Sequence, residues 1–121
     1  MAELSILIVE DEWLIAALIE EALLDAGYQV QLATNGDKAA EQLSNSPDEF
    51  DILLTDIRMP GSTSGWDLAR RARELNADLP VIYMTGDSFA AWKREGVSGS
   101  LMFQKPVSTQ SLINAVAELL D

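Results

Sequence analysis

Five short apolar runs recur along the chain and predict five β-strands. They are Ser5–Val9, Tyr28–Ala33, Ile52–Thr55, Pro80–Met84 and Leu101–Phe103. The first, third and fourth runs are almost wholly apolar rather than alternating, which is typical of parallel strands that are covered on both faces. The pattern therefore indicates a buried parallel sheet.

Segments with helical periodicity lie between and after these runs. The helix before Gly27 ends at a suitable C-terminal glycine, and Ser108 is the expected N-cap of the last helix, which follows Pro106. The five expected helices are a segment with the apolar stripe Ile15, Leu18, Ile19, Ala22, Leu23 and Ala26, a short one from Asn35-Gly36-Asp37, one from Ser64-Gly65 through Leu68, Ala69 and Ala72, a short one over Ser88–Glu95, and one with Leu112, Ile113, Val116, Leu119 and Leu120.

Strict alternation of strands and helices predicts an α/β fold, with a doubly wound parallel sheet and right-handed crossovers. A length of 121 residues suits one domain with one core, so we expect residues 1–121 to form a single domain. In such sheets the functional site lies at the carboxyl ends of the strands, near the point where the strand order reverses. Functional residues are therefore expected directly after strands.

Composition narrows the possible chemistry. Twenty acidic and eight basic residues give a formal charge of −12, which opposes binding to nucleic acid or anionic lipid. The absence of Cys excludes disulfides, and the absence of His excludes His-based acid–base catalysis and most zinc sites. Without signal-peptide features or a stretch of membrane-spanning length, a cytoplasmic protein is expected.

Acidic residues follow the first and third predicted strands. Glu10 and Asp11 come directly after the first strand, and Asp56 comes directly after the third. Their carboxylate oxygens suit Mg²⁺ (or Mn²⁺), and the backbone carbonyl of Arg58 offers a further oxygen ligand. Two carboxylates about 4 Å apart repel by roughly 4 kcal/mol at an effective dielectric of 20, so the cluster favours a bound cation. The sequence therefore predicts a magnesium site.

Three side chains supply the predicted reaction. Asp56 is the candidate nucleophile, which would accept a phosphoryl group as an aspartyl phosphate. Thr85 and Lys105 follow the fourth and fifth strands and offer a hydroxyl and a positive charge to the phosphoryl oxygens. Phosphoryl transfer depends on positioning and charge neutralisation more than on proton transfer, so the lack of His is no obstacle. Any phosphohistidine must belong to a partner.

Four motifs resemble the receiver domain of bacterial two-component response regulators, the family of the chemotaxis receiver protein. They are Leu7-Ile8-Val9-Glu10-Asp11-Glu12, Asp51-Ile52-Leu53-Leu54-Thr55-Asp56-Ile57-Arg58-Met59-Pro60, Met84-Thr85-Gly86 and Gln104-Lys105-Pro106. The resemblance covers essentially the whole chain and implies a flavodoxin-like (βα)5 fold with strand order 2-1-3-4-5. It implies that Asp56 is the phosphoacceptor, with Glu10 and Asp11 as the acidic pair, Thr85 as the switch hydroxyl and Lys105 as the phosphate-contacting lysine.

The resemblance also implies a role and partners. The domain would catalyse its own phosphorylation and dephosphorylation and control an output protein or domain, rather than turn over an external substrate. A sensor histidine kinase or a histidine phosphotransfer protein would be the donor. Arg58 and Asp87, two residues after Asp56 and Thr85 respectively, would tune the access of the hydrolytic water.

Three features depart from the family's pattern. Met102 stands three residues before Lys105, where most members have an aromatic residue or His that reports phosphorylation. The loop from Pro60 to Gly65 is one residue longer than usual, and the stretch Gly86–Gly96 is short for the fourth helix. Phe103, Tyr83 and Trp92 are alternative candidates for the role of the missing aromatic residue, and the sequence does not show which of them, if any, takes it.

Other functions stay open at this stage. A Mg²⁺-dependent phosphatase or phosphotransferase that uses Asp56 is disfavoured, because such enzymes generally need a second acid–base carboxylate where Arg58 stands. A flavin- or nucleotide-binding domain is disfavoured because the first strand is followed by acidic residues, which repel phosphate. A receiver that binds partners without phosphorylation is disfavoured because all of the expected site residues are present. Taken one at a time, each of these residues also suits a helix terminus or a turn.

Overall fold

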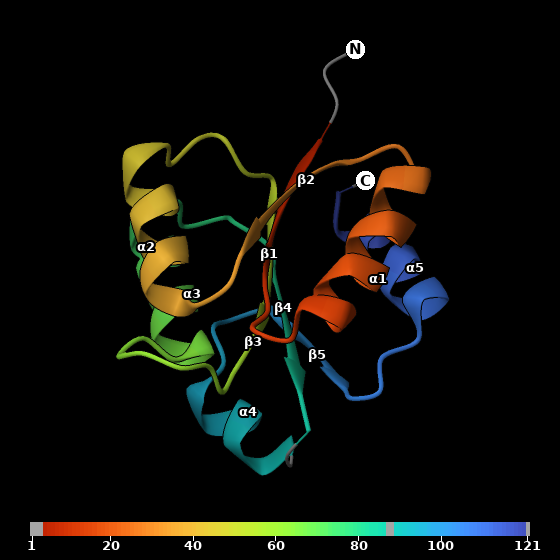
Figure 1. Ribbon diagram of the computed structural model, residues 1–121. Coiled ribbons are helices and arrows are strands. Elements are labelled where there is room, and N and C mark those ends of the chain that lie inside the picture. Colours follow the sequence, from red (N-terminus) through yellow and green to blue (C-terminus); the bar gives the residue numbers. More distant parts are fainter. Residues whose placement is uncertain (1–3, 87–88, 121) are drawn as a thin grey trace.

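Five parallel strands form one sheet in the order β2-β1-β3-β4-β5, in a computed structural model that describes residues 4–86 and 89–120 (Figure 1). The strands are β1 (Ser5–Val9), β2 (Gln29–Ala33), β3 (Ile52–Asp56), β4 (Val81–Thr85) and β5 (Leu101–Gln104). The order and the parallel pairing confirm the predicted doubly wound, flavodoxin-like sheet. Its strand order reverses between β1 and β3, so residues after these two strands flank the expected position of a site.

Helices cover both faces of this sheet. They are α1 (Trp13–Asp25), α2 (Gly36–Asn45), α3 (Gly65–Leu75), α4 (Phe89–Glu95) and α5 (Thr109–Leu120). Figure 1 shows α1 and α5 on one side of the sheet, and α2 and α3 on the other. Among the described residues, no helix has the length and apolar character needed to cross a membrane.

Side chains of the central strands alternate between two cores. Leu7 and Leu53 belong to the core on the α2–α3 side, whereas Ile8 and Leu54 belong to the core on the α1–α5 side. All four are fully buried, and full burial of such a side chain stabilises a fold by about 1.5–3 kcal/mol. The strands that carry the site residues therefore form a rigid base.

The helix ends follow the expected capping residues. Asn35 Oδ1 accepts a hydrogen bond from the Lys38 amide at 2.8 Å, and Ser108 Oγ accepts one from the Ser111 amide at 3.2 Å. Ser64 forms a capping box at the start of α3. Gly27 has a φ of +100° just after α1, a conformation that favours glycine.

The predicted buried stripe of α1 is partly wrong. Ile19 and Leu23 are buried as expected, but Leu18 and Ala26 are exposed and Ala16 is buried instead. The first half of α1 is apolar on nearly every side, so periodicity alone could not choose the face that packs on the sheet.

Some predicted boundaries also shift by one residue. Asp56 and Thr85 are the last residues of β3 and β4 rather than the first residues after them, and β2 begins at Gln29 rather than Tyr28. The fourth helix begins at Phe89 and has seven residues, which confirms that it is short. The expected first residue of that helix, Ser88, lies outside the described residues.

Candidate functional site

Three carboxylates meet where β1 and β3 end. One oxygen from each of Glu10, Asp11 and Asp56 lies within 4.8 Å of the others. Glu10 and Asp56 are only 1% and 6% exposed, whereas Asp11 faces solvent. The structure thus brings together the three side chains that the sequence predicts as metal ligands. Their hard oxygen donors suit Mg²⁺, which keeps several water ligands and uses few protein carboxylates.

Lys105 joins two of these carboxylates. Its Nζ lies 2.7 Å from Glu10 Oε1 and 2.9 Å from Asp56 Oδ2, with Glu12 Oε1 farther away at 3.9 Å. The Lys105 amide donates to the Thr85 carbonyl at 2.7 Å, which fixes the start of the segment after β5. The ammonium group therefore offsets the carboxylate repulsion that was expected to need a metal ion.

Burial and neighbouring charges shift two pKa values in this cluster. Burial raises the pKa of Glu10 from 4.5 to about 7, and the Asp56 charge adds to the effect, while Lys105 and the Glu12 amide oppose it. Burial lowers the pKa of Lys105, but its contacts with Glu10 and Asp56 outweigh this and raise it overall. Lys105 is therefore a cation at neutral pH, and Glu10 exchanges its proton near neutrality.

The backbone around Asp56 fixes its carboxylate. The Ile57 amide donates to Asp56 Oδ1 at 2.7 Å, which leaves Oδ2 for Lys105. The Gly65 amide donates to the Ile57 carbonyl at 2.8 Å and closes the loop after β3. A Cβ atom on Gly65 would lie 2.2 Å from the Asp56 carbonyl oxygen, so the close approach of α3 to this backbone requires glycine.

A cleft of about 270 Å³ opens above this cluster. It is lined by Glu12, Asp56, Arg58, Thr85, Gly86 and Lys105. Four of these lining residues are predicted site residues, namely Asp56, Arg58, Thr85 and Lys105. The other two predicted metal ligands, Glu10 and Asp11, lie in the adjoining acidic cluster. Glu12 and Gly86 were not predicted as site residues, although each is the last residue of one of the four motifs. Asp87 lies outside the described residues.

The family model of the response regulator receiver domain matches residues 6–117. The chain belongs to this family. Receiver domains are signalling domains, and phosphorylation on an aspartate by histidine kinases is their family function. The fold and the acidic cleft of this chain can therefore be interpreted in terms of this family function.

Relatives and solved structures agree with this assignment. The chain is 35% identical over 117 residues to the response regulator receiver protein CpdR of Brucella abortus (strain 2308). The aligned region covers 95% of this chain and 95% of CpdR. A receiver protein crystal structure from Sinorhizobium medicae WSM419 has a TM-score of 0.93 and 36% identity, covering 98% of this chain and 94% of that one. The structure of the response regulator TrrA of Thermotoga maritima, solved in complex with Mg²⁺-BeF, has a TM-score of 0.84 and 29% identity. The match covers 97% of this chain and 99% of the TrrA chain.

Other relatives are much longer than this receiver domain. The chain is 38% identical to the transcriptional regulatory protein YrkP of Bacillus subtilis (strain 168) over 88% of its own length, but spans 45% of that protein. It is 33% identical to the sensor protein EvgS of Escherichia coli (strain K12) over 97% of its length, but spans 10% of that protein. Receiver domains thus occur in proteins of very different size.

Proposed function

We propose that Asp56 is the residue that accepts the phosphoryl group in this receiver domain. The observation that carries the proposal is the position of its Oδ2 atom, 2.9 Å from Lys105 Nζ and beside the Glu10 and Asp11 carboxylates. A carboxylate so placed is both nucleophilic and close to the cation that a phosphoryl group needs.

In the proposed reaction, a carboxylate oxygen of Asp56 attacks the phosphorus of a partner's phosphohistidine. The new O–P bond forms as the P–N bond breaks, and the electron pair of that bond returns to the leaving imidazole. Lys105 and the Thr85 hydroxyl bind the transferred phosphoryl oxygens, whose negative charge they stabilise. Hydrolysis then releases phosphate, so the domain catalyses both its own phosphorylation and its own dephosphorylation.

Glu10, Asp11, Asp56 and the Arg58 carbonyl are the proposed ligands of Mg²⁺. When bound, the ion neutralises negative charge on the phosphoryl oxygens. The chain supplies two of these carboxylates from buried positions at the ends of β1 and β3, and the third from the solvent side, which leaves room for water and phosphoryl ligands.

Single-domain organisation over residues 1–121 and a cytoplasmic location stay predictions.

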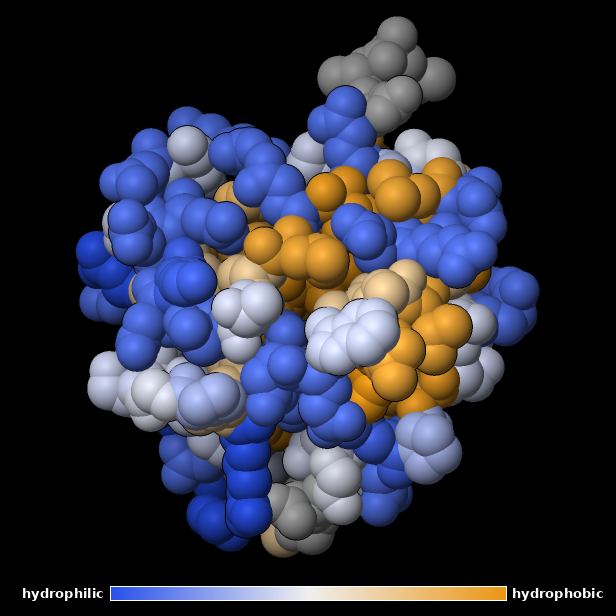
Figure 2. Space-filling view, viewed as in Figure 1, coloured by the Kyte–Doolittle hydropathy of each residue, from blue (hydrophilic) through white to orange (hydrophobic). Residues whose placement is uncertain are grey.

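The exposed face of α1 is the proposed docking surface for the phosphodonor. Trp13, Leu14 and Leu18 are 73%, 61% and 61% exposed, and Figure 2 shows a hydrophobic patch over this helix. Leu18 also lines an apolar groove of about 150 Å³, together with Ile15, Ile19, Pro106, Val107 and Thr109. An apolar patch of this kind marks an interaction site.

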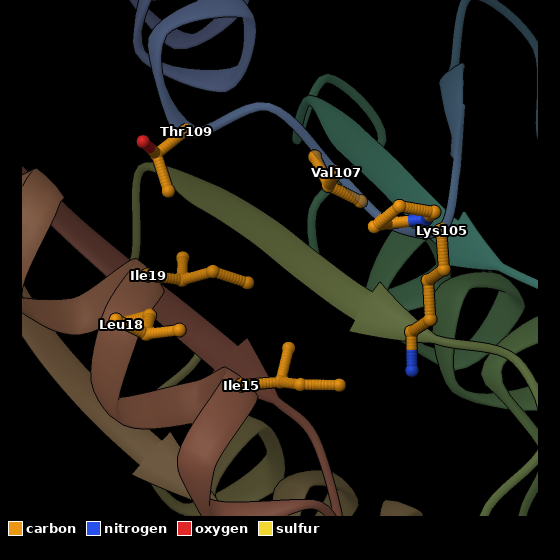
Figure 3. A pocket seen from close by; sticks show the side chains of 7 residues that line it. Ile15, Leu18, Ile19, Lys105, Val107 and Thr109 are labelled. Carbon is orange, nitrogen blue, oxygen red and sulfur yellow. The ribbon is translucent and has the colours of Figure 1, made fainter.

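The groove and the phosphorylation cleft share one residue. Figure 3 shows Lys105 at the edge of the groove, and Lys105 also lines the cleft. A partner seated on α1 would therefore hold its reactive group close to Asp56, which contacts Lys105. Residues 1–37 contain no Lys or Arg, and Glu20 and Glu21 lie within α1. The complementary partner is therefore a helix with apolar and basic side chains that carries the phosphohistidine, from a sensor kinase or a phosphotransfer protein.

Mass spectrometry of the intact protein tests the role of Asp56. The protein is incubated with Mg²⁺ and phosphoramidate, and one added phosphate is expected. Asp56→Asn should show none, whereas Asp51→Asn, at the other end of β3, should be phosphorylated like the wild type. The proposal is wrong if neither phosphoramidate nor a cognate kinase gives an adduct, or if Asp56→Asn still gives one.

A further inference from the structure

The loop after β3 is tied to the start of α2 by Asp37. The Ser62 amide donates to Asp37 Oδ2 at 3.2 Å, and the Ser62 hydroxyl donates to Oδ1 at 3.0 Å. The Thr63 hydroxyl donates a further hydrogen bond to Oδ1. The Asp37 side chain thus accepts three hydrogen bonds from two adjacent residues that lie 25 and 26 positions after it in the sequence.

Glycines on both sides allow this contact. A Cβ atom on Gly36, the first residue of α2, would lie 2.3 Å from the Thr63 carbonyl oxygen. Gly61 has a φ of +103°, and a Cβ atom there would lie 2.7 Å from Asp37 Oδ2. The loop and the helix therefore approach more closely than residues with a side chain would permit.

Asp37 is suited to act as an ionised acceptor. The Thr63 hydroxyl, the Ser62 amide and the Ser62 hydroxyl all lower the pKa of Asp37. It also lies in the first turn of α2, where the helix dipole stabilises negative charge. The carboxylate is thus held in the charged form that can accept all three hydrogen bonds.

The same loop forms one wall of the phosphorylation cleft. Arg58 lines the cleft near the start of the loop, and the hydrogen bond from Gly65 to Ile57 closes its base. Asp37 holds the far end, at Ser62 and Thr63. An irregular loop loses conformational freedom when it is held in one arrangement, and a third point of attachment restricts this loop further.

We propose that Asp37 is a positioning residue for the phosphorylation site, which holds the Gly61–Thr63 segment and thereby keeps Arg58, whose carbonyl is a proposed Mg²⁺ ligand, in the lining of the cleft. This inference rests on the proposed function of the cleft. Asp37 touches neither the acidic cluster nor the phosphoryl group, and it acts only through the loop.

Isothermal titration with Mg²⁺ tests the inference. Asp37→Ala is expected to weaken Mg²⁺ binding about tenfold, as residues that support metal ligands commonly do. Asp37→Asn keeps one oxygen acceptor and is expected to give an intermediate affinity. In phosphorylation by phosphoramidate, Asp37→Ala should raise the Mg²⁺ concentration that gives the half-maximal rate, while the rate at saturating Mg²⁺ stays close to that of the wild type.

Asn35→Ala is the matched control, because it removes the N-cap of the same helix without touching the loop. It should lower the melting temperature and leave the Mg²⁺ dissociation constant unchanged. The inference is overturned if Asp37→Ala binds Mg²⁺ like the wild type, or if both variants weaken binding equally. A wild-type protein that binds no Mg²⁺ would overturn the proposed metal site and this inference together, whereas a failure confined to Asp37→Ala leaves the role of Asp56 intact.

Discussion

Lys105 Nζ lies 2.9 Å from Asp56 Oδ2, so the proposed phosphoacceptor is paired with a cation before any phosphoryl group arrives. The same ammonium contacts Glu10 Oε1 at 2.7 Å. It therefore competes with a divalent cation for both carboxylates, and it becomes free to bind phosphoryl oxygens when that cation takes its place. Removal of the Lys105 ammonium should therefore change Mg²⁺ binding and phosphorylation in opposite directions.

Replacing Lys105 with Met should separate the two effects. Without the ammonium, Glu10 and Asp56 lose a close positive charge that competes with Mg²⁺ for them, and we expect the Mg²⁺ affinity at pH 8 to rise about three- to tenfold. Phosphorylation by phosphoramidate at saturating Mg²⁺ should fall about 100-fold, because the developing charge on the phosphoryl group loses its stabilising cation. Titration calorimetry and mass spectrometry measure the two quantities.

Lys93→Met is the control for this substitution. Lys93 is an exposed cation on α4, so its replacement changes the net charge equally but should alter neither quantity. A Lys105→Met protein that binds Mg²⁺ more weakly than the wild type would show that the ammonium does not compete for the carboxylates.

Glu10 should make stability depend on pH when divalent cations are removed with a chelator. Its pKa is raised on folding from 4.5 to about 7, so the folded state binds the proton more tightly than the unfolded state. The Glu10 contribution to the free energy of unfolding therefore decreases as pH rises from about 4.5 to 7, and is constant above that range. Over this interval we expect it to account for a loss on the order of 1–3 kcal/mol.

Urea unfolding at several pH values measures this effect. Glu10→Gln cannot titrate at this position, so the difference in stability between wild type and variant should change between pH 5 and pH 7.5 and stay level above it. Glu41→Gln, an exposed residue of α2, should keep the wild-type profile. A Glu10→Gln protein with the same pH profile as the wild type would contradict the raised pKa of Glu10.

The positions of most residues of the proposed phosphorylation site could be predicted because these residues lie at or just after the ends of parallel strands. The carboxyl ends of β1, β3, β4 and β5 lie at one edge of the sheet, so Glu10, Asp56, Thr85 and Lys105 had to meet there once the alternation of elements was clear. The contact of Asp37 with the loop after β3 follows no such rule. It joins the first turn of α2 to an irregular loop, and the sequence around Asp37, Asn35-Gly36-Asp37, indicates only the start of a helix.

The side of the sheet on which Met102 and Phe103 pack is a second feature that the sequence does not reveal. Met102 pairs with Tyr83 across β4 and β5 and packs on the α2–α3 side, whereas Phe103 packs on the opposite side of the sheet. Phe103 thus points away from the core that holds Tyr83 and Trp92. Which of two adjacent residues faces which core depends on the strand register, and a run as short as Leu101–Phe103 does not reveal it.

Tyr83 joins β4 to the segment between α4 and β5, and removing its hydroxyl should weaken that link. The Val97 amide donates to Tyr83 Oη at 3.1 Å, and the Tyr83 ring is fully buried against Trp66. Tyr83→Phe leaves this partly buried amide without its acceptor, so we expect a loss of about 1–2 kcal/mol in the free energy of unfolding. Tyr28→Phe, which alters a hydroxyl just before β2, should cost less than about 0.5 kcal/mol.

Urea denaturation measures both tyrosine variants. If the hydroxyl of Tyr83 only fills space, Tyr83→Phe and Tyr28→Phe will be equally stable. Hydrogen exchange of the Val97 amide offers a direct readout, since it should become faster in Tyr83→Phe alone.

Gly65 is expected to tolerate no side chain, because α3 begins against the backbone of Asp56. Gly65→Ala places a methyl group 2.2 Å from the Asp56 carbonyl oxygen, so the backbone must move, at a cost of about 1–3 kcal/mol. Phosphorylation should slow as well, since the moving segment carries the amide that holds Asp56 Oδ1. Gly86→Ala is the control at the same cleft, because its methyl group would meet no atom of the described residues within 4 Å. Equal stability of the two variants in urea would show that the close approach at Gly65 is not needed.

The groove on α1 leads to a prediction that separates partner binding from chemistry. Leu18→Glu adds a charge to an exposed residue that lines the groove but belongs neither to the acidic cluster nor to the lining of the phosphorylation cleft. Transfer from a phosphohistidine protein should fall about tenfold or more, as expected when an apolar anchor of an interface is lost. Phosphorylation by phosphoramidate needs no docking surface and should keep its wild-type rate.

Leu32→Glu is the matched control for the groove variant, because Leu32 is an exposed leucine on the edge strand β2. Both variants add one negative charge to an acidic protein, so a general electrostatic effect on a donor would slow them equally. A specific docking surface slows only Leu18→Glu, and mainly through a higher half-saturating concentration of the donor protein. Equal rates for the two variants with the phosphohistidine protein would place the docking surface elsewhere on the domain.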